Sequence, residues 1–351
     1  YNEVIVKNVR AVSAADAEAV AEEIATADIM ATAVGVNVLP RISKPVAMGL
    51  KRRWEKGNNT PLDIIICENM LDANHYLAGL IKQELNGAET ERFNESVGLV
   101  EASIGRMVPV MTTEMQEGNP LRVWVEPYEE LPVDKAGFKG KIPDIRNMVP
   151  FAPFDFYIQR KLFMHNMAHA TLAYLGFLFN KTYLWEAIRI PVVKLAVLRA
   201  LQESAPAMSQ EHGVPLGKLM EHADDLVYRF GNKLLGDTVE RVGKDPVRKL
   251  SANDRMIGAF RLCIKQGINP VFISVGIAAG FIFAPESDEA AAKVQGFIEK
   301  NGIEKAVREF CGLDASDKMF EIIVDFYHML KQGDTLEAVL EKAERIKRQL
   351  G

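Results

Sequence analysis

Three side chains that could move a proton lie close together on one apolar stretch of the chain. Lys161, Asn166 and His169 stand within the run KLFMHNMAH. At about 100° per residue, an α-helix places all three within an arc of roughly 140°, on one face. A lysine whose pKa is lowered by burial can exchange a proton near neutral pH, a neutral amide can hydrogen-bond a developing oxyanion, and an imidazole can hold a hydroxyl. The set suits hydride transfer between an alcohol and a carbonyl.

Two other interpretations of this stretch stay open when it is taken alone. A lysine on a helix is usually solvated, and a histidine on an apolar face is usually a hydrogen-bonded core residue. His165 and His169 are also spaced i, i+4, as two helical metal ligands are. Because no glutamate follows His165 and no third-ligand motif appears downstream, we expect no metal site.

Short β-rich runs alternate with amphipathic helices over the first 134 residues. Runs this apolar, alternating with helices, predict a mostly parallel sheet covered on both faces. Asn69 follows one of the apolar runs, at the carboxyl end of a strand, where open α/β sheets place ligand contacts; a simple turn residue is the alternative. The expected strands are Val4–Val6, Asp28–Val34, Asp63–Cys67 and Leu121–Glu126, and the expected helices are Ala14–Thr26 and Ile42–Lys56.

Long helical periodicities fill the second half of the chain. They predict an all-α domain after a linker that contains Pro150 and Pro153, so we expect domains at residues 1–150 and 151–351, with a loop at Phe138–Pro143. The expected helices are Gln159–Asn180, Ile190–Ser204, Pro215–Arg229, Asp254–Gln266, Asp288–Asn301 and Met319–Leu330.

The composition of the chain excludes some classes of binding partner and indicates a cellular compartment. A formal net charge of −5 argues against general nucleic-acid binding, which needs an excess of Lys and Arg. The longest apolar stretch, Pro270–Pro285, is too short to span a membrane, which takes about 20 residues. Three scattered cysteines suit free thiols in a reducing compartment. We therefore expect a cytoplasmic protein.

Several segments, taken in order, resemble the polyol-specific long-chain dehydrogenases, the mannitol dehydrogenase family. The run that starts at Lys161 resembles their Lys-x4-Asn-x2-His signature. The likeness extends over nearly the whole chain and implies an α/β Rossmann-type domain, N-terminally incomplete in this chain, followed by an all-α C-terminal domain. The other segments that carry it are TAVG at 32–35, KGNNTPLDIIICENM, FKGKIPDI and RFGNKLLGDTVERVGKDPVRKLSANDR.

The resemblance also implies roles for particular residues. Lys161 would be the general acid and base, and Asn69 and Asn166 would polarise the reacting oxygen. Substrate would be bound by His169, Arg241 and Lys249, and cofactor by Thr32, Ala33, Val34, Gly35 and Asn69. From the residues alone, a basic cluster of Arg241, Lys244, Arg248 and Lys249 could neutralise a sugar phosphate, although a solvated loop is the alternative for Lys244 and Arg248.

Two departures from the family pattern stand out. Gly105-Arg106 replaces a usual Asp-Arg pair, so a carboxylate expected near the substrate is absent. No G-x-G-x-x-G loop occurs in the chain, although this loop normally holds the cofactor pyrophosphate. We expect N-terminal residues to be missing before Tyr1 and the chain as given to bind cofactor poorly. NAD is carried over from the family, and NADP stays open because the acidic residue that selects between them cannot be read.

The expected activity is metal-independent hydride transfer between NAD(H) and a sugar alcohol phosphate, with mannitol 1-phosphate and fructose 6-phosphate as the pair. Mannitol 2-dehydrogenase or hexuronate (fructuronate or tagaturonate) reductase activity is the alternative within the class. A non-catalytic sugar-phosphate-binding relative is the alternative outside it. The apolar pattern at 320–330 could pack within one chain or against a second copy, and family analogy favours a monomer.

Overall fold

The computed structural model describes residues 3–70 and 72–350 of the chain. It divides into a sheet unit, residues 1–106 and 128–157, and a helical unit, residues 107–127 and 158–351. The excursion at 107–127 thus packs with the helical unit although it interrupts the sheet unit in the sequence. The predicted order of a Rossmann-type domain followed by a helix-rich domain is confirmed.

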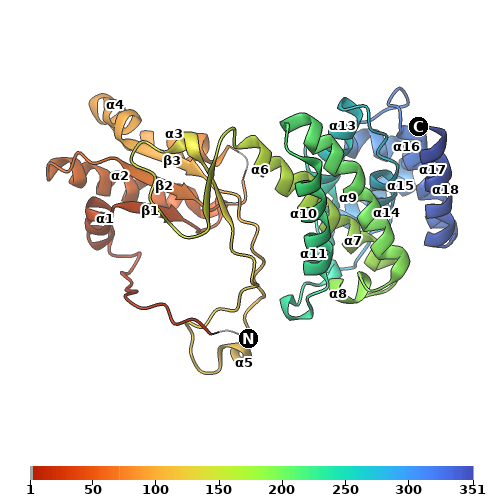
Figure 1. The fold of residues 1–351 in the computed structure, drawn as a ribbon, viewed down its shortest axis with the longest axis horizontal. Coiled ribbons are helices and arrows are strands. Elements are labelled where there is room, and N and C mark those ends of the chain that lie inside the picture. Colours follow the sequence, from red (N-terminus) through yellow and green to blue (C-terminus); the bar gives the residue numbers. More distant parts are fainter. Residues whose placement is uncertain (1–2, 71, 351) are drawn as a thin grey trace. The chain divides into compact units, whose positions relative to one another are not determined.

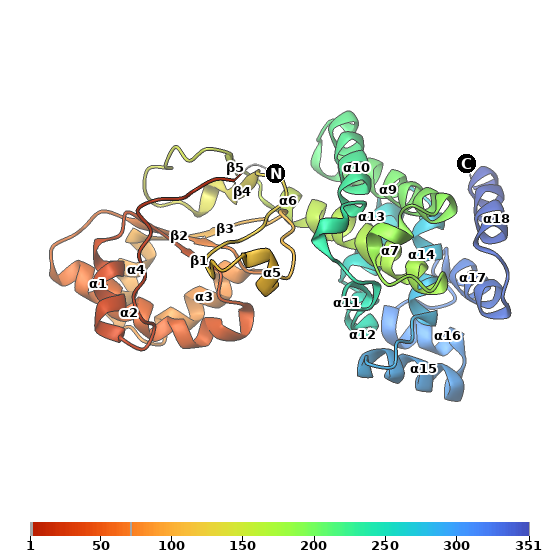
Figure 2. The ribbon, with the colours of Figure 1, turned by 90° about the horizontal axis from the view of Figure 1, so that it is seen from below.

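The sheet unit is built on three parallel strands in the order β1-β2-β3. Leu62, Ile64 and Ile66 of β2 point into one core under the helices, whereas Ile65 points to the opposite face, where it packs with Val100 and other apolar residues. Figure 2 shows α1 to α4 on one side of this sheet and the two-stranded β4-β5 sheet with its loops on the other. The strands are β1 (Ile29–Thr32), β2 (Leu62–Ile66), β3 (Val97–Glu101), β4 (Leu131–Asp134) and β5 (Met148–Phe151).

Capping and close packing explain where the helices of the sheet unit lie. Asp16 accepts the Ala19 N–H at 3.0 Å and so begins α1. Gly49 lets α2 approach α1, because a Cβ there would lie 2.5 Å from the Cβ of Ile24. The helices are α1 (Ala17–Thr26), α2 (Leu39–Glu55), α3 (Ala73–Lys82) and α4 (Gly87–Ser96), with short turns η1 (Val36–Val38) and η2 (Lys135–Gly137).

Two strands predicted from the sequence are wrong. Val4–Val6 is extended but belongs to no strand, and its side chains are at least 75% exposed. Leu121–Glu126 forms no strand either, and its Trp124 indole N–H donates to the Met115 carbonyl at 3.0 Å, so a short helix, Thr113–Gln116, covers it instead of a neighbouring strand. A high β propensity indicates only that the side chains fit a pleated surface. It does not show that a neighbouring strand is available to pair with the segment.

The helical unit is all-α, as predicted, and packs around a fully apolar helix. The predicted helices are all present, most of them with ends displaced by a few residues, but the helix predicted at Ile190–Ser204 continues to His212. α14, within the apolar run Pro270–Pro285, is buried along nearly its whole length and contacts α7, α9 and α17. Within the described residues no helix is long and apolar enough to cross a membrane. On α17, Ile323 and Phe326 are fully buried within the single chain, so this pattern packs internally.

Figure 1 labels most of the helices of this unit. The helices are α5 (Thr113–Gln116), α6 (Asp155–Arg160, which connects the two units), η3 (Lys161–Asn166), α7 (Met167–Leu178), α8 (Leu184–Ala187), α9 (Pro191–His212), α10 (Leu216–Phe230), η4 (Lys233–Leu235), α11 (Val239–Gly243), α12 (Pro246–Lys249), α13 (Arg255–Lys265), α14 (Val271–Ile282), α15 (Glu289–Asn301), α16 (Ile303–Ala306), η5 (Val307–Cys311), α17 (Phe320–Gln332) and α18 (Leu336–Gln349).

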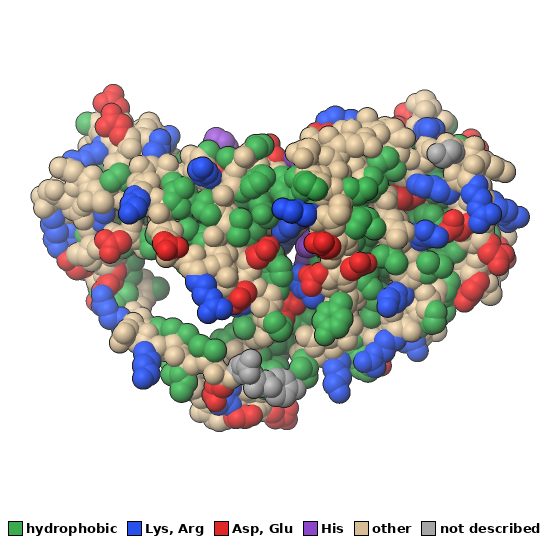
Figure 3. Space-filling model, in the orientation of Figure 1, with side chains coloured by type: hydrophobic (Ala, Val, Ile, Leu, Met, Phe, Trp, Pro, Cys, Tyr) green, Lys and Arg blue, Asp and Glu red, His purple; other side chains and the backbone are tan. Residues whose placement is uncertain are grey.

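A buried ion pair ties the excursion at 107–127 to the helices. Both Glu126 oxygens accept from Arg229 of α10, at 2.9 Å from Nε and 2.5 Å from the second nitrogen, and the Glu126 side chain is only 2% exposed. Glu126 also accepts the Met107 N–H. On the face seen in Figure 3, by contrast, acidic and basic side chains are interspersed at the surface, where single ion pairs add little stability.

Arg229 provides a matched test of this difference, because it also pairs with exposed Asp225 at 3.3 Å. Glu126→Gln should lower the free energy of unfolding by about 3 kcal/mol, since it leaves a buried guanidinium without its counter-charge. Asp225→Asn, at the same arginine, should cost less than about 1 kcal/mol. Urea denaturation followed by circular dichroism measures both, and equal losses would contradict the assignment.

Candidate active site

The predicted cofactor residues lie at one edge of the parallel sheet. β1 ends at Thr32, and Ala33, Val34 and Gly35 form the loop that follows. β1 and β2 are hydrogen-bonded neighbours, with Thr32 paired to Ile66, so their carboxyl ends lie side by side. Asn69 follows β2 at this same edge, as the sequence predicted.

A carboxylate that the sequence analysis gave no role fixes this loop. Glu68 accepts the N–H of Val34 at 2.8 Å and that of Gly35 at 2.9 Å, one with each oxygen. Gly35 has φ +88°, which favours glycine, and a Cβ there would meet no atom within 4 Å. Glu68 is 8% exposed. The sequence feature that could have identified Glu68 is its position, an acidic residue directly after an apolar strand.

These features fit the nicotinamide end of a dinucleotide. The Thr32 hydroxyl is buried and has no hydrogen-bond partner within the described residues, so it can take one from a bound group. Asn69 supplies an amide beside it at the edge where open α/β sheets bind such cofactors. No glycine-rich loop for a pyrophosphate occurs in the sequence, and we derive no contact to one.

Lys161 and Asn166 stand at the two ends of a π-helical turn, η3, where the sequence predicted regular α-helix. The Met167 N–H reaches back five residues to the Leu162 carbonyl, the bond that defines such a turn. Because the turn holds an extra residue, positions five apart lie closer in angle than in an α-helix, so Lys161 and Asn166 face more nearly the same side. π-turns of this kind are frequent at functional sites.

Neighbouring helices hold the widened turn in place. The buried Ser204 hydroxyl on α9 donates to the Phe163 carbonyl at 2.8 Å, a carbonyl that the Met167 N–H passes over. Gly258 on α13 lets the Phe163 ring come close, since a Cβ there would lie 2.3 Å from it. Nothing in the sequence marks Ser204 for this role, because the contact joins residues 41 positions apart.

His169, one turn further along on α7, is oriented by a carboxylate from another element. Its Nε2 lies 3.3 Å from Asp237 Oδ2, and the other Asp237 oxygen pairs with Arg241. The Phe230 ring stacks on the imidazole with centroids 4.9 Å apart. His169, Phe230 and Asp237 line a small hollow of the helical unit together with Trp185. The signal for Asp237 was its i, i+4 spacing from Arg241.

His169 is a neutral hydrogen-bonding group. Burial, reinforced by the positive charges of Arg241, Arg255 and Lys249, lowers the pKa of His169 to about 3. Asp237 therefore faces a neutral imidazole, with Nε2 3.3 Å from its carboxylate. A carboxylate beside Nε2 favours the tautomer with the proton on that nitrogen, which leaves Nδ1 as an acceptor for a hydroxyl. His165 packs edge-on against His169, with centroids 5.7 Å apart.

Lys161 is partly buried and Lys249 is almost fully buried, and the pKa of each is lowered. Burial is the larger cause of the lowered pKa of Lys161, and the charge of Arg255 adds to it. Burial and Arg255 likewise lower the pKa of Lys249 to about 8. Lys249 donates to the Lys244 carbonyl. Neither the sequence patterns nor the family resemblance had singled out Arg255.

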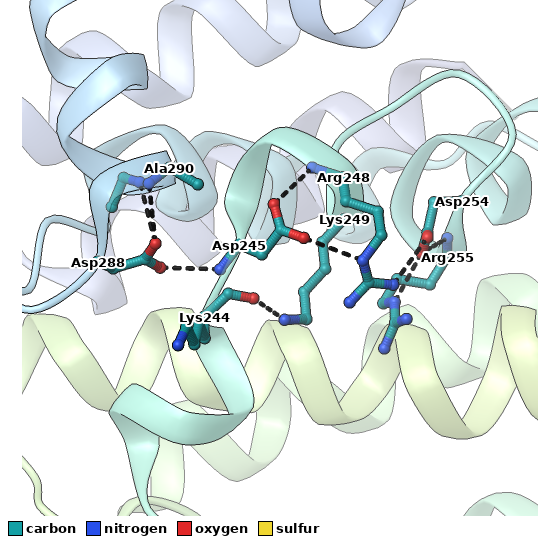
Figure 4. Close-up of polar contacts among 9 residues, drawn as sticks. Lys244, Asp245, Arg248, Lys249, Asp254, Arg255, Asp288 and Ala290 are labelled. Carbon is teal, nitrogen blue, oxygen red and sulfur yellow. Dashed lines mark hydrogen bonds and ion pairs between the residues drawn. The ribbon is translucent and has the colours of Figure 1, made fainter. Parts of the chain in front are cut away.

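The basic cluster predicted from the sequence separates into distinct environments (Figure 4). Arg248 is occupied by two carboxylates, Asp245 at 3.0 Å and Asp254 at 3.2 Å, and half of its side chain is exposed. Lys244 is exposed. Lys249 is 6% exposed. Burial thus distinguishes Lys249 from its two basic neighbours on this segment.

Gly105, the departure from the family pattern, lies in the sheet unit against an aromatic ring. A Cβ at Gly105 would lie 3.1 Å from the Tyr128 ring, so an aspartate there would require Tyr128 to shift. Arg106 donates to the Tyr128 carbonyl. The Tyr128 ring therefore packs where the side chain of an aspartate at position 105 would begin.

Comparison with known proteins places both halves of the chain in one family. Residues 1–147 match the profile of the mannitol dehydrogenase Rossmann domain, and residues 154–346 match that of the mannitol dehydrogenase C-terminal domain. A mannitol-1-phosphate 5-dehydrogenase of Thermoanaerobacter pseudethanolicus is 36% identical over 328 residues, 93% of this chain and 83% of its own length.

Two solved structures share the fold at low sequence identity. A D-sorbitol dehydrogenase in substrate-free form superposes with a TM-score of 0.78 at 15% identity, over 93% of this chain and 77% of its own. Mannitol 2-dehydrogenase of Pseudomonas fluorescens, in a ternary complex with NAD and D-mannitol, gives 0.70 at 16% identity, over 94% and 77%.

The support of the π-turn by Ser204 can be tested with a second buried serine. Ser204→Ala should lower the free energy of unfolding by about 1–3 kcal/mol, because it removes a buried donor from the Phe163 carbonyl. Ser274 is the control, since its hydroxyl and its own N–H both bond the Pro270 carbonyl, and Ser274→Ala leaves that carbonyl paired. Amide hydrogen exchange should rise around 161–167 in the Ser204 variant alone. Unchanged exchange there would contradict the assignment.

Proposed function

This chain belongs to the mannitol dehydrogenase family, and we propose that it transfers a hydride between NAD(H) and a sugar alcohol phosphate, interconverting mannitol 1-phosphate and fructose 6-phosphate. The observation that carries the proposal is the partly buried Lys161 on a π-turn that aligns it with Asn166, which lies one turn before a neutral His169. The phosphorylated substrate is supported by the name of the 36% identical relative.

Lys161 moves the proton. NAD, when bound, accepts a hydride from the alcohol carbon and returns it in the reverse reaction. In oxidation, the neutral amine of Lys161 accepts the hydroxyl proton at Nζ; in reduction, its ammonium form gives a proton to the carbonyl oxygen. Because the fold lowers the pKa of Lys161, a larger share of the amine is available near neutral pH.

The amide and imidazole groups hold the reacting oxygen and its neighbours. Asn166, aligned with Lys161 by the π-turn, donates to the oxygen as negative charge develops on it. His169 accepts a substrate hydroxyl at Nδ1 while Asp237 holds its ring. In the sheet unit, Asn69 and the Thr32–Gly35 loop braced by Glu68 would hold the nicotinamide end of the cofactor.

The proposal extends to partners and compartment. The substrate is a small polyol phosphate, and the enzyme works as a monomer in the cytoplasm. Support comes from the free cysteines Cys67, Cys263 and Cys311, which suit a reducing compartment, and from the apolar face of α17, which is covered within one chain.

Lys161→Ala should lower kcat by about 100- to 10,000-fold while the fold stays intact. In the unchanged protein, kcat for oxidation should rise with pH and level off once Lys161 is neutral, below the usual lysine pKa; the reduction rate should fall over the same range. Lys181→Ala, at an exposed lysine, should keep both profiles. A rising oxidation profile that survives Lys161→Ala would exclude Lys161 as the base.

The substrate is tested by NADH oxidation with fructose 6-phosphate and, separately, free fructose, using protein expressed from the complete gene. We expect turnover with the phosphate and little with the free sugar. Turnover with free fructose alone would indicate a mannitol 2-dehydrogenase. Turnover with neither sugar but with fructuronate or tagaturonate would indicate a hexuronate reductase, and turnover with none of these would favour a non-catalytic sugar-phosphate-binding relative.

A further inference from the structure

Arg255 occupies the first position of α13 and is held there by its own N-cap. The Asp254 carboxylate lies 2.7 Å from Arg255 Nε and accepts its backbone N–H at 2.6 Å. Only 14% of the Arg255 side chain is exposed. Within the described residues, Asp254 is the carboxylate paired with Arg255, and it engages Nε. The two terminal nitrogens of the guanidinium therefore remain available to a ligand.

Two packing contacts fix α13 against the segment that carries the proton-transfer residues. Gly258 meets the Phe163 ring in the π-turn, and Met256 receives the Thr171 hydroxyl of α7 at 3.9 Å. Arg255 precedes both contacts on α13. Figure 4 shows the Arg255 and Lys249 side chains extending to the same side of α12 and α13, towards the yellow-green helix behind them.

The charge around this position is mostly positive and partly buried. The guanidinium of Arg255 acts on Lys161, on His169 and on Lys249, and in each case it adds to burial in lowering the pKa. Asp254, the nearest counter-charge, is shared with Arg248. Surroundings that destabilise cations in this way stabilise an anion placed among them.

A buried hydroxyl without a hydrogen-bond partner among the described residues lies within the electrostatic reach of Arg255. The Tyr174 hydroxyl on α7 is fully buried and has no hydrogen-bond partner within the described part of the chain. The charges of Arg255, Asp245 and Asp254 all act on it. Together with the terminal nitrogens of Arg255, it forms a donor-rich environment that an oxygen-rich anion would satisfy.

We propose that Arg255 binds the phosphoryl group of the substrate, together with Lys249, and so selects phosphorylated over free polyols. This inference rests on the proposed function and deepens it. An arginine whose Nε is already held presents its two terminal nitrogens as a fork, the geometry that suits two oxygens of one phosphate. In fructose 6-phosphate the phosphate and the carbonyl lie towards opposite ends of one short carbon chain, so the phosphate needs its own binding residue, on an element packed against the segment that carries Lys161, as α13 is. Arg248 is not the candidate, because two carboxylates already occupy it.

Arg255→Gln tests the assignment by a change in specificity. The value of kcat/KM for fructose 6-phosphate should fall about 10- to 100-fold, mainly through KM, because a charged hydrogen-bonding pair is lost. The lower kcat/KM for free fructose should change less than about threefold when both proteins are compared on their pH plateaus, because the charge of Arg255 also lowers the pKa of Lys161. Arg255→Lys keeps the positive charge but loses the two parallel donors of the guanidinium, so its kcat/KM for fructose 6-phosphate should lie between those of the wild type and Arg255→Gln. Arg261→Gln is the matched control, since Arg261 is an exposed arginine of the same helix bonded to the Gly312 carbonyl. Equal losses for both sugars, or no loss for either, would overturn the inference.

A binding measurement separates this inference from the proposed function. Inorganic phosphate titrated by calorimetry into the NAD-loaded protein should bind the wild type and the Arg261→Gln variant, and binding should weaken at least about 10-fold in Arg255→Gln. Thermal unfolding confirms that each variant is folded. If fructose 6-phosphate is not turned over but phosphate binding still depends on Arg255, the proposed substrate is wrong and the anion site stands. Equal phosphate binding in all three proteins would sink the anion site whatever the substrate.

Discussion

The widened helical turn at Lys161–Asn166 is the constraint on which the rest of the candidate site depends. One extra residue in the turn brings the amine and the amide, five positions apart, onto a single side. Such a turn persists only where its surroundings hold it. Here a serine hydroxyl from α9 bonds one of its carbonyls, and a glycine on α13 gives its phenylalanine room. The packing of two long helices, which contributes stability, is thereby also what aligns the proton-transfer groups.

Single carboxylates with two bonded partners recur wherever the structure must fix a functional segment. Glu68 spans two backbone amides of the loop after β1. Asp237 joins the imidazole of His169 to the guanidinium of Arg241, and Asp254 joins two arginines. Each uses one oxygen for each partner, so that two groups are oriented by one side chain. The buried Glu126 also joins two partners, with both oxygens on Arg229 and one of them on the Met107 N–H as well. These acids hold the basic and amide groups in place and leave them able to meet a ligand.

Burial and like charge act together in the helical unit. Lys161, His169 and Lys249 all lose affinity for protons because they are withdrawn from water beside Arg255. A neutral imidazole and a readily deprotonated lysine suit the exchange of a proton with an alcohol. The same electropositive surroundings suit an anionic substrate. In the proposed mechanism, acid–base chemistry and recognition of the substrate's charge would thus depend on one arrangement of residues rather than on two separate sites.

The sequence by itself determined the elements and the chemistry that each one carries. Apolar periodicity predicted the parallel strands at Asp28–Val34 and Asp63–Cys67 and the long helices of the second half, because buried positions repeat every two residues in a strand and every 3.6 residues in a helix. The residue types on one of these helices then indicated a lysine, an amide and a histidine that could act together. Periodicity failed at Val4–Val6 and Leu121–Glu126, where a strand needs a partner that no local pattern supplies. Only the tertiary structure decided that the helix widens at Lys161, that Glu68 and Asp237 brace the site, and that Arg255 stands beside it. Each of these depends on contacts between residues distant in the chain, which packing creates and periodicity cannot encode.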